Sequence, residues 1–294
     1  MIVVEMAGGV GNQLFQYAAA RVVADRLETG LGIDVRVCRA ADSRPYGLDA
    51  FQIRGSVVPD GDLLGVHGPK SLRGHLTRGL VTRARAMLQR PRLAHLTRVV
   101  HQGPGYCSEL DHVADDSWLC GYWQSERYFV DAAARIRADL QVKTVSPETA
   151  AVERQLRAMA FPVAAHVRRG DYAAVESTRR FHGLLSAEYY RTAMQQIRTV
   201  HPRAEFVFFS DDPGWVADNL GRDLSLLVTA NGHERPFEDL HLMTRCRAHV
   251  IANSSFSWWG AWLAASDLVI APARWFQAPE MARFTIVPDR WRRL

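Results

Sequence analysis

The segment FPVAAHVRRGDY, residues 161–172, joins a short apolar run to a charged turn. An apolar run of this length is typical of a buried strand. Arg168 and Arg169 follow it, at the edge where open α/β sheets bind their ligands. Guanidinium groups offer planar pairs of donors that match phosphate oxygens. The segment therefore predicts a parallel sheet with a site for a phosphate-bearing ligand. A surface arginine pair beside a turn is the alternative.

Strand and helix patterns alternate along the rest of the chain. The strand patterns cover residues 2–6, 31–38, 118–122, 163–167, 206–210, 224–228, 248–252 and 268–271. The helical patterns cover residues 13–27, 126–140, 148–160, 187–200, 213–220, 237–246 and 256–265. Such alternation indicates parallel sheets with right-handed crossovers. Since 294 residues exceed one ordinary core, we expect an α/β protein with two Rossmann-like domains facing a cleft, residues 1–145 and 146–294.

The sequence has four cysteines, which are widely spaced and form no CxxC pair. This spacing gives little support to a zinc site or a disulfide framework and favours reduced thiols. The first residues lack the pattern of a signal peptide, and no apolar run approaches the ~20 residues that span a bilayer. We therefore expect a cytoplasmic protein, either soluble or attached peripherally to the inner face of the membrane.

Positive charge gathers in one part of the chain. Residues 65–108 contain no Asp or Glu but eight Lys or Arg, so they account for the net charge of +5. Apolar residues recur at helical spacing beside the arginines of residues 76–88. A basic amphipathic helix is typical of contact with anionic lipid, a phosphate-bearing acceptor or nucleic acid. A solvated helix face is the alternative. Among the partners we expect an anionic membrane or a lipid-linked, phosphate-bearing ligand, and no nucleic acid.

A glycine-rich turn follows the first strand pattern. Gly9 and Gly11 begin a dinucleotide-binding fingerprint, but Leu14 occupies the third glycine position and no acid ends the second strand. A glycine turn at a helix N-terminus still presents backbone N–H groups, and Asn12 adds a side-chain amide. These groups could contact a diphosphate or sugar hydroxyls. A plain turn with Asn12 as the helix cap is the alternative.

Five sequence blocks stand in order along the chain: GGVGNQLFQY (8–17), GYWQSERYF (121–129), HVRRGDY (166–172), VFFSDD (207–212) and ANSSFSWWGAW (252–262). Each block alone is weak, but the ordered set is specific. Together they closely resemble the bacterial α-1,2-fucosyltransferases of glycosyltransferase family 11, over nearly the whole chain. The resemblance implies a two-domain GT-B-type fold and GDP-β-L-fucose as the donor substrate, with no cofactor and no metal. It also implies inverting transfer to the 2-hydroxyl of a galactose-containing acceptor.

The resemblance also implies roles for single residues. Arg168 would contact the donor diphosphate, and His166 the nucleoside. The implied donor-binding residues are Gly9, Gly11, Asn12, His166, Arg168, Arg169, Ser254, Ser255 and Phe256, of which the last three would hold the phosphates. The resemblance does not identify the carboxylate that recognises guanine, for which Asp211, Glu238 and Asp239 are the candidates.

The chemistry of sugar transfer fits these residues. Breaking the sugar–phosphate bond builds negative charge on the leaving GDP, so donors aimed at it stabilise the transition state. An arginine and a helix N-terminus can do this without a metal. Asp171 is the candidate base for the acceptor hydroxyl, and bracing of Arg168 is its alternative role. Asp211 and Asp212 resemble the acidic metal site of other glycosyltransferases, but we expect no metal there; a helix cap before Pro213 is the other interpretation.

Three other functions stay open at this point. They are an inverting glycosyltransferase that uses another nucleotide sugar, a nucleotide- or lipid-binding protein without catalysis, and a Rossmann oxidoreductase. Selective binding of GDP, UDP or NAD(P) would separate them. We also expect Trp258, Trp259 and Trp262 to pack in the core rather than stack on sugar.

Overall fold

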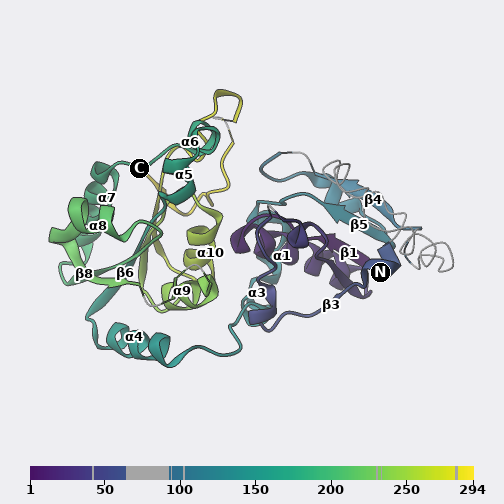
Figure 1. The fold of residues 1–294 in the computed structure, drawn as a ribbon, viewed down its shortest axis with the longest axis horizontal. Coiled ribbons are helices and arrows are strands. Elements are labelled where there is room, and N and C mark those ends of the chain that lie inside the picture. Colours follow the sequence, from purple (N-terminus) through teal and green to yellow (C-terminus); the bar gives the residue numbers. More distant parts are fainter. Residues whose placement is uncertain are drawn as a thin grey trace. The chain divides into compact units, whose positions relative to one another are not determined.

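The computed structural model describes residues 1–41, 43–63, 93, 95–101, 103–229, 231–232, 234–281 and 284–294. The chain forms two compact units. Unit 1 comprises Met1–Leu48 and Ile53–Ile136, and unit 2 comprises Asp49–Gln52 and Arg137–Leu294. The colours of Figure 1 follow the sequence and so distinguish the two units.

The units divide at Ile136, whereas the sequence led us to place the boundary after residue 145. The reason lies in residues 49–52, which leave unit 1 to pair with the segment that enters unit 2. Phe51 and Val142 form an antiparallel bridge. Backbone hydrogen bonds of 2.9 Å extend this bridge on both sides, joining Gln52 to Gln141 and Ala50 to Lys143.

Unit 1 is built on a five-stranded parallel sheet with the order β3-β2-β1-β5-β4. The strands are β1 (Ile2–Glu5), β2 (Leu31–Asp34), β3 (Ser56–Val57), β4 (Thr97–Val100) and β5 (Ser117–Cys120). The helices are α1 (Val10–Arg26), the short 3-10 turns η1 (Val37–Arg39), η2 (Leu48–Ala50), η3 (Asp60–Leu63), η5 (Ser108–His112), η6 (Glu126–Tyr128) and η7 (Val130–Ala132), and α3 (Ala133–Asp139), which leads into unit 2. Strand β1 is fully buried, as expected for the centre of a parallel sheet covered on both faces.

The strand predicted over residues 31–38 ends early, at Asp34. The buried carboxylate of Asp34 accepts a hydrogen bond from Arg36 N at 3.0 Å. Such a local bond occupies a backbone N–H that would otherwise pair with the neighbouring strand, and the chain turns at this point. Cys38 therefore lies in η1 rather than in a strand.

The helix predicted over residues 126–140 is also interrupted. It begins as the two 3-10 turns η6 and η7 and becomes α-helical only at Ala133. Between the turns, Phe129 has a φ of −144° and a ψ of 5°. Its buried ring lies 6.0 Å from the ring of Phe15 on α1. Burial of this ring against a distant helix thus overrides local helical spacing.

Unit 2 is built on a six-stranded parallel sheet with the order β11-β10-β9-β6-β7-β8. The strands are β6 (Phe161–Val167), β7 (Ala204–Ser210), β8 (Leu224–Val228), β9 (Ala248–Val250), β10 (Leu268–Ala271) and β11 (Arg292–Arg293). The helices are α4 (Pro147–Ala158), α5 (Gly170–Ala174), α6 (Glu176–His182), α7 (Ala187–Val200), α8 (Pro213–Leu220), α9 (Pro236–Met243) and α10 (Ser255–Leu263), with the short turns η8 (Gly221–Asp223) and η9 (Pro279–Met281). The predicted strand–helix alternation is confirmed.

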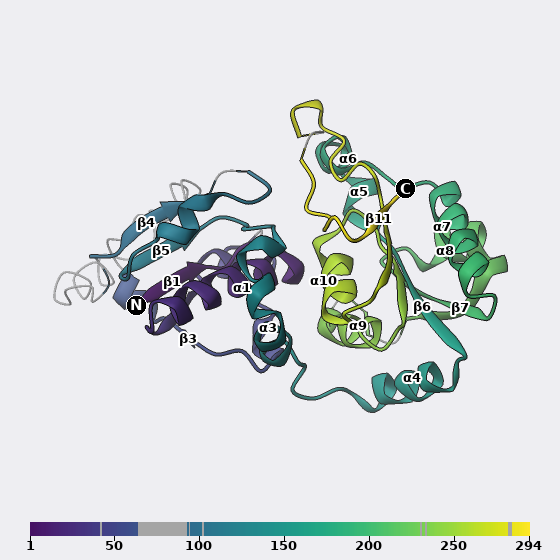
Figure 2. The ribbon, with the colours of Figure 1, turned by 180° about the vertical axis from the view of Figure 1, so that it is seen from behind.

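Successive residues of β6 face opposite sides of this sheet. Val163, Ala165 and Val167 join a buried cluster with side chains of α7 and α8. Ala164 joins a second cluster with side chains of α4 and α9. Figures 1 and 2 show α7 and α8 on one face of the sheet and α9 and α10 on the other. Because helices cover both faces of the sheet, polar side chains that could bind a ligand are expected at the ends of the strands.

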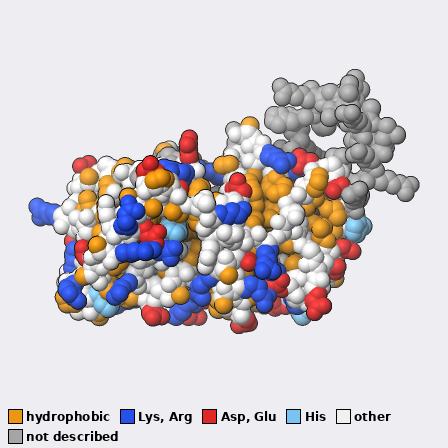
Figure 3. All heavy atoms as spheres, turned by 90° about the horizontal axis from the view of Figure 1, so that it is seen from below, with side chains coloured by type: hydrophobic (Ala, Val, Ile, Leu, Met, Phe, Trp, Pro, Cys, Tyr) orange, Lys and Arg blue, Asp and Glu red, His pale blue; other side chains and the backbone are white. Residues whose placement is uncertain are grey.

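The basic amphipathic helix predicted within residues 65–108 lies outside the described residues, as do all basic residues of that segment except Arg98. Arg98 lies on β4, where its guanidinium carbon is 5.3 Å from the ring centre of Trp118. On the face drawn in Figure 3, basic and acidic side chains are interspersed. Among helices of the described ranges, none combines the length and apolar character that a membrane span requires.

Candidate functional site

Three predicted site residues follow neighbouring strands of unit 2. Arg168 follows β6, Asp211 follows β7 and Ser254 comes shortly after β9. The chain adds β7 and β8 on one side of β6 and places β9, β10 and β11 on the other. The switch point therefore lies between β6 and β9, where open α/β sheets bind ligands beyond the carboxyl ends of their strands. In Figure 1, α5 and α6 lie at this end of β6.

Arg168 lies between two carboxylates. Its Nη2 is 2.5 Å from Asp171 Oδ1, and its Nη1 is 2.7 Å from Asp211 Oδ2. The guanidinium carbon lies 5.4 Å from the ring centre of Tyr172. Asp211 is 10% exposed, Arg168 25% and Asp171 34%, so exposure rises across the cluster. This arrangement orients a cation at the switch point and leaves it partly accessible to an anionic ligand.

Arg169 is held by the residues that follow β7. Its backbone N donates to Asp211 Oδ1 at 2.8 Å, and its Nε donates to Asp212 Oδ2 at 3.2 Å. Its guanidinium carbon lies 4.3 Å from the ring centre of Trp215. Gly170 makes room for Asp211, because a Cβ at this position would lie 2.5 Å from Asp211 Oδ2. Asp211 thus contacts both arginines, and the glycine permits its close approach.

Asp212 caps helix α8. Its Oδ1 accepts a hydrogen bond from Trp215 N at 3.0 Å, and its own N donates to Ser210 Oγ at 3.0 Å. Pro213 occupies the first helical position, where a missing N–H costs nothing. The capping interpretation of this acidic block is therefore confirmed for Asp212.

The turn before α10 presents an uncapped helix N-terminus. Ser254 is the N-cap residue, but its side chain makes no capping hydrogen bond. Ser257 Oγ donates to Ser254 O and Ala252 O, both at 3.3 Å. The first backbone N–H groups of an α-helix have no acceptor within the helix, and the helix dipole favours negative charge there. Ser254, Ser255 and Phe256 are therefore placed to hold an anion.

His166 lies near the end of β6, beside that turn. Its ring centre is 5.5 Å from that of Phe256, and the residue is 6% exposed. Burial lowers the pKa of His166, against the raising effect of Asp211 and with a further lowering by Arg168. Its Nδ1 has no hydrogen-bond partner among the described residues. His166 is therefore a neutral ring whose Nδ1 is buried.

Sequence reasoning missed the residues that connect the two halves of this site. Tyr172 Oη donates to Asn253 O at 3.2 Å, and Asn253 Nδ2 donates to His182 O at 2.6 Å. The ring of His182 stacks on that of Tyr172, with centres 4.6 Å apart. These contacts join the turn after β6 to the turn before α10. Tyr172 and Asn253 lie within the blocks that carry the family resemblance, whereas His182 had no sequence signal.

Glu238 and Asp239 at the start of α9 have protein partners. Buried Glu238 accepts hydrogen bonds from Ser146 N at 3.1 Å, Ser146 Oγ at 2.6 Å and Thr149 Oγ1. Although burial raises its pKa, these bonds hold the pKa of Glu238 below its ordinary value. Asp239 accepts from Asn231 Nδ2 at 2.7 Å, and burial raises its pKa to about 6. Glu238 thus ties α9 to α4, and contact with a nucleoside stays a prediction for both acids.

The glycine loop of unit 1 lies at the switch point between β1 and β5. Gly9 is the N-cap of α1, so Asn12 lies inside the first turn and its interpretation as the cap is wrong. Instead, Asn12 Oδ1 accepts from Gln124 Nε2 at 2.8 Å. Gly8 has a left-handed φ of 75°, and a Cβ there would lie 2.7 Å from Asn12 Nδ2. Contact of Gly9, Gly11 and Asn12 with a donor stays a prediction.

The tryptophans of α10 belong to the core, as expected. Trp258, Trp259 and Trp262 are at most 1% exposed. The ring centres of Trp258 and Trp259 are 5.1 Å apart, and those of Trp259 and Trp262 are 5.3 Å apart. These rings anchor α10 and so position its N-terminal turn.

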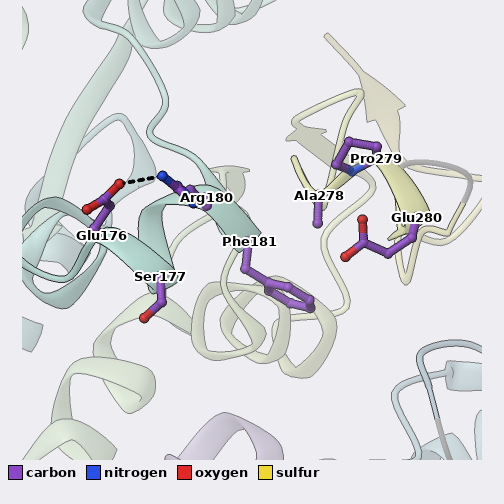
Figure 4. Close-up of a pocket in the computed structure, with 7 residues that line it drawn as sticks. All are labelled: Glu176, Ser177, Arg180, Phe181, Ala278, Pro279 and Glu280. Carbon is purple, nitrogen blue, oxygen red and sulfur yellow. Dashed lines mark ion pairs between the residues drawn. The ribbon is translucent and has the colours of Figure 1, made fainter.

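A cavity of about 530 Å³ lies on unit 2 between α6 and residues 278–280. Figure 4 shows Phe181, Ala278 and Glu280 around it, with Glu176 and Arg180 at one side. These last two form an exposed ion pair of 2.7 Å. None of the predicted site residues lines the cavity, and we assign it no part in the chemistry.

The two units, each built on a parallel α/β sheet, have the GT-B-type architecture found in a group of glycosyltransferases. The chain resembles the fucosyltransferase NodZ from Bradyrhizobium with a TM-score of 0.58 and 15% identity, over 92% of this chain and 94% of that chain. NodZ α-1,6-fucosyltransferase soaked with GDP-fucose gives a TM-score of 0.56. At these identities the likeness shows the fold, and the expected pair of Rossmann-like α/β domains is confirmed.

Residues 112–293 match glycosyl transferase family 11, and the chain belongs to this family. It is 28% identical over 303 residues to an α-1,2-colitosyltransferase from Escherichia coli, covering 100% of this chain and 99% of that protein. It is 34% identical over 110 residues to galactoside α-(1,2)-fucosyltransferase 1 from Leontocebus fuscicollis, covering 36% of this chain and 30% of that protein. The chain is therefore an enzyme that transfers fucose or a related sugar. An oxidoreductase and a binding protein without catalysis are set aside.

Proposed function

We propose that this enzyme transfers L-fucose from GDP-β-L-fucose to the 2-hydroxyl of a galactoside, with inversion, and so forms an α-1,2 linkage. The observation that carries the proposal is Arg168, held between Asp171 and Asp211 at the switch point of unit 2. The relatives named for α-1,2 transfer and the fold relative soaked with GDP-fucose support the choice of donor and linkage.

The site suits a reaction in which GDP leaves. As the bond between the anomeric carbon and the β-phosphate breaks, negative charge grows on the diphosphate and positive charge on the sugar. Arg168 and the N-terminal turn of α10 are aimed donors whose interactions strengthen as that charge develops. His166, as a neutral buried donor or acceptor, would contact the nucleoside, and Arg169 adds a second positive charge.

Asp171 is the proposed base. It is the most exposed member of its cluster with Arg168 and Asp211, and its carboxylate contacts the arginine that would hold the donor. A base in this place would accept the proton of the acceptor 2-hydroxyl as the oxygen attacks the anomeric carbon. Attack from the face opposite GDP converts the β-linked donor into an α-linked product. Bracing of Arg168 is the other role for Asp171, and the test below separates the two.

We propose that the reaction needs no metal and no cofactor. Asp211 and Asp212, which resemble an acidic metal site, are already committed to Arg168, Arg169 and the start of α8. Two guanidiniums and a helix N-terminus supply the positive field that a divalent cation provides in other phosphoryl-leaving reactions.

We further propose a galactose-containing acceptor that is handled by unit 1. Its linkage to a lipid, and peripheral contact with an anionic inner membrane surface, are predictions from residues 65–108. They rest on sequence alone, since most of that segment lies outside the described residues. Binding of the purified chain to anionic and neutral vesicles would test them.

A second candidate donor is the GDP derivative of colitose, because a relative that matches over the whole chain is named a colitosyltransferase. Colitose is fucose without its 3-hydroxyl. A site that hydrogen-bonds this hydroxyl discriminates strongly against the sugar that lacks it, whereas an apolar site discriminates weakly. The ratio of kcat/KM for the two donors therefore decides between the candidates.

The experiment is a transfer assay with GDP-fucose, GDP-colitose and a UDP-sugar against a panel of galactosides, with NMR assignment of the product. We expect an α-1,2-fucoside, GDP bound in preference to UDP, and full activity in EDTA. A β-linked product would exclude the single-displacement mechanism. Loss of activity in EDTA with recovery on Mg²⁺ or Mn²⁺ would show that the acidic block binds a metal.

A further inference from the structure

We infer that the loop after β5 in unit 1, centred on Tyr122, binds the pyranose ring of the acceptor sugar. The inference rests on the proposed function, because it assigns the galactoside to a surface that the donor-binding residues of unit 2 do not include. It is carried by the backbone of the loop, the exposure of one ring and two half-buried carboxamides of the adjoining loops.

The backbone is unusual on both sides of Tyr122. Gly121 has a φ of 141° and Trp123 a φ of 51°. A Cβ at Gly121 would lie 2.8 Å from His101 O, so only glycine fits. A bulky residue with positive φ is an outlier, and such strain persists where the surrounding structure imposes it, commonly at ligand sites. A glycine and a strained tryptophan thus fix the backbone on both sides of Tyr122.

Packing behind the loop holds this conformation. Trp123 is fully buried, and its ring stacks on that of His101 with centres 4.9 Å apart. The ring of Tyr128 meets Trp123 edge-on at 5.8 Å. Gln16 Nε2 donates to Gly121 O at 3.1 Å and so ties the loop to α1. Trp123 is therefore an anchor turned into the core, and Tyr122 is turned outward.

Tyr122 is 46% exposed, and no other Phe, Tyr or Trp of the described residues is as open to solvent. A large exposed ring held on a rigid backbone loses little freedom when a ligand stacks on it. The C–H face of a pyranose is apolar and matches such a ring, while its hydroxyls need hydrogen-bond partners around the rim.

The loops after β1 and β5 carry carboxamides, and one of them, Gln124, follows Tyr122 in the same loop. Half-buried Gln124 donates to Asn12 Oδ1 at 2.8 Å, and Gln16 Oε1 accepts from Ala7 N at 3.0 Å. These side chains hold the loops after β1 and β5 together at the switch point of unit 1, the position where parallel sheets bind ligands. Gln16 is buried, whereas Gln124 and Asn12 are half-buried, and uncharged amides of this kind suit the hydroxyls of a galactopyranoside.

The test compares Tyr122→Ala, Tyr122→Leu and Tyr122→Phe, with Val130→Ala as the matched control because Val130 is a comparably exposed apolar residue of the same unit, at 41%. The acceptor is lactose and the donor GDP-fucose. We expect the Ala and Leu variants to raise the acceptor KM about tenfold, the lower end of what loss of an aromatic stacking platform costs. The Phe and control variants should resemble the wild type, and the donor KM should be unchanged throughout.

Saturation-transfer NMR with methyl β-D-galactopyranoside, without any donor, gives a second readout that needs no turnover. Its signal should persist in Tyr122→Phe and disappear in Tyr122→Leu. An unchanged acceptor KM and an unchanged NMR signal in Tyr122→Leu would overturn the inference while leaving fucosyl transfer intact. If the wild type transfers no fucose but binds the galactoside through Tyr122, the proposed donor is wrong and the acceptor surface stands.

Discussion

The carboxyl edges of the two sheets share a topology but differ in chemistry. The switch point of unit 2 gathers two arginines and three carboxylates: Arg168, Arg169, Asp171, Asp211 and Asp212. The switch point of unit 1 gathers carboxamides and an exposed ring: Asn12, Gln16, Gln124 and Tyr122. The parallel sheet supplies the position of each site, while the residues that follow the strands decide the ligand. This difference supports the proposal that unit 2 binds the charged diphosphate and that unit 1 binds the neutral acceptor sugar.

Among the variants considered, replacement of Arg168 should lower kcat the most and so gives the strongest test of the charged site in unit 2. Arg168→Ala removes the guanidinium that we propose contacts the leaving diphosphate, and we expect kcat to fall about 10³-fold while the protein stays folded. Arg168→Lys should recover little, because lysine lacks the planar fork. Stopped assays with GDP-fucose and lactose, with circular dichroism for folding, measure both effects.

Arg180→Ala is the control for that variant. Arg180 lies on α6, the next helix along the chain, and pairs with Glu176 at 2.7 Å with 80% of its side chain exposed. An exposed pair of this kind contributes little to stability, so the variant should keep wild-type turnover. If both variants lost the same turnover, removal of any positive charge from this region would lower activity. The proposed role of Arg168 would then be wrong.

Asp171→Asn should have the next largest effect, a fall in kcat of about 10²-fold. Asp171 is also the more exposed of the two carboxylates on Arg168, so a diphosphate competes with it for the guanidinium. The variant should therefore bind GDP at least as tightly as the wild type while turning over slowly. The pH profile of kcat should also differ from that of the wild type.

Glu176→Gln, which removes an exposed carboxylate from α6, controls for the loss of one negative charge. It should leave kcat and its pH profile unchanged. An Asp171→Asn variant that binds GDP weakly and keeps the wild-type pH profile would show that Asp171 braces Arg168 and is not the base.

The sequence predicted the elements of unit 2 well for a physical reason. The bounds of α7, α8, β8 and β10 agree with the patterns, because apolar spacing and local caps such as Ser186 and Asp212 define where these elements begin and end. The errors in unit 1 occur where a side-chain interaction ends or interrupts a predicted element. The carboxylate of Asp34 accepts a hydrogen bond from the backbone N of Arg36, and the predicted strand ends there.

The site divides in the same way. Residues at strand ends, such as Arg168, could be predicted because parallel strands bring their carboxyl ends to one edge. The bond between Tyr172 and Asn253 could not, because it joins residues 81 positions apart. The room that Gly170 leaves for Asp211 likewise depends on the register of β6 and β7, which local sequence does not reveal.

Gly170→Ala tests whether the position of Asp211 in the charged site matters, because it shifts this carboxylate without removing a charge. A Cβ at this position would lie 2.5 Å from Asp211 Oδ2, so the carboxylate that contacts Arg168 must shift. Misplacement of a positioned group by less than 1 Å justifies an expected loss of about tenfold in kcat/KM for the donor.

Gly214→Ala is the matched control, since a Cβ there meets only Asp212 Oδ1, at 4.0 Å. Alanine also suits a helix better than glycine, so Tm should stay level or rise. If the two alanine variants behave alike, the distance between Gly170 and Asp211 has no bearing on the donor.

The smallest effect concerns Asp239, an acid of unit 2 outside the arginine cluster. Burial raises its pKa to about 6 from an ordinary value of 3.8. The folded state therefore favours the protonated acid, and the stability that this provides is complete below pH 4 and is lost as the pH rises through about 6. Asp239→Asn keeps an oxygen for Asn231 Nδ2 and removes the titration. It should match the wild type at pH 4 and exceed its unfolding free energy by about 1–2 kcal/mol at pH 7.

Urea denaturation at both pH values measures that difference, with Glu234→Gln, an exposed acid before the same helix, as the control. Titration of Asp239→Asn with GDP and ADP then distinguishes a structural role of Asp239 from a role in nucleotide recognition. Unchanged GDP affinity would make it part of the scaffold that joins Asn231 to α9. A loss of affinity for GDP but not for ADP would make Asp239 the residue that reads guanine, because only guanine offers a pair of N–H donors to a carboxylate. The recognition of the donor would then extend beyond the arginine cluster to the start of α9.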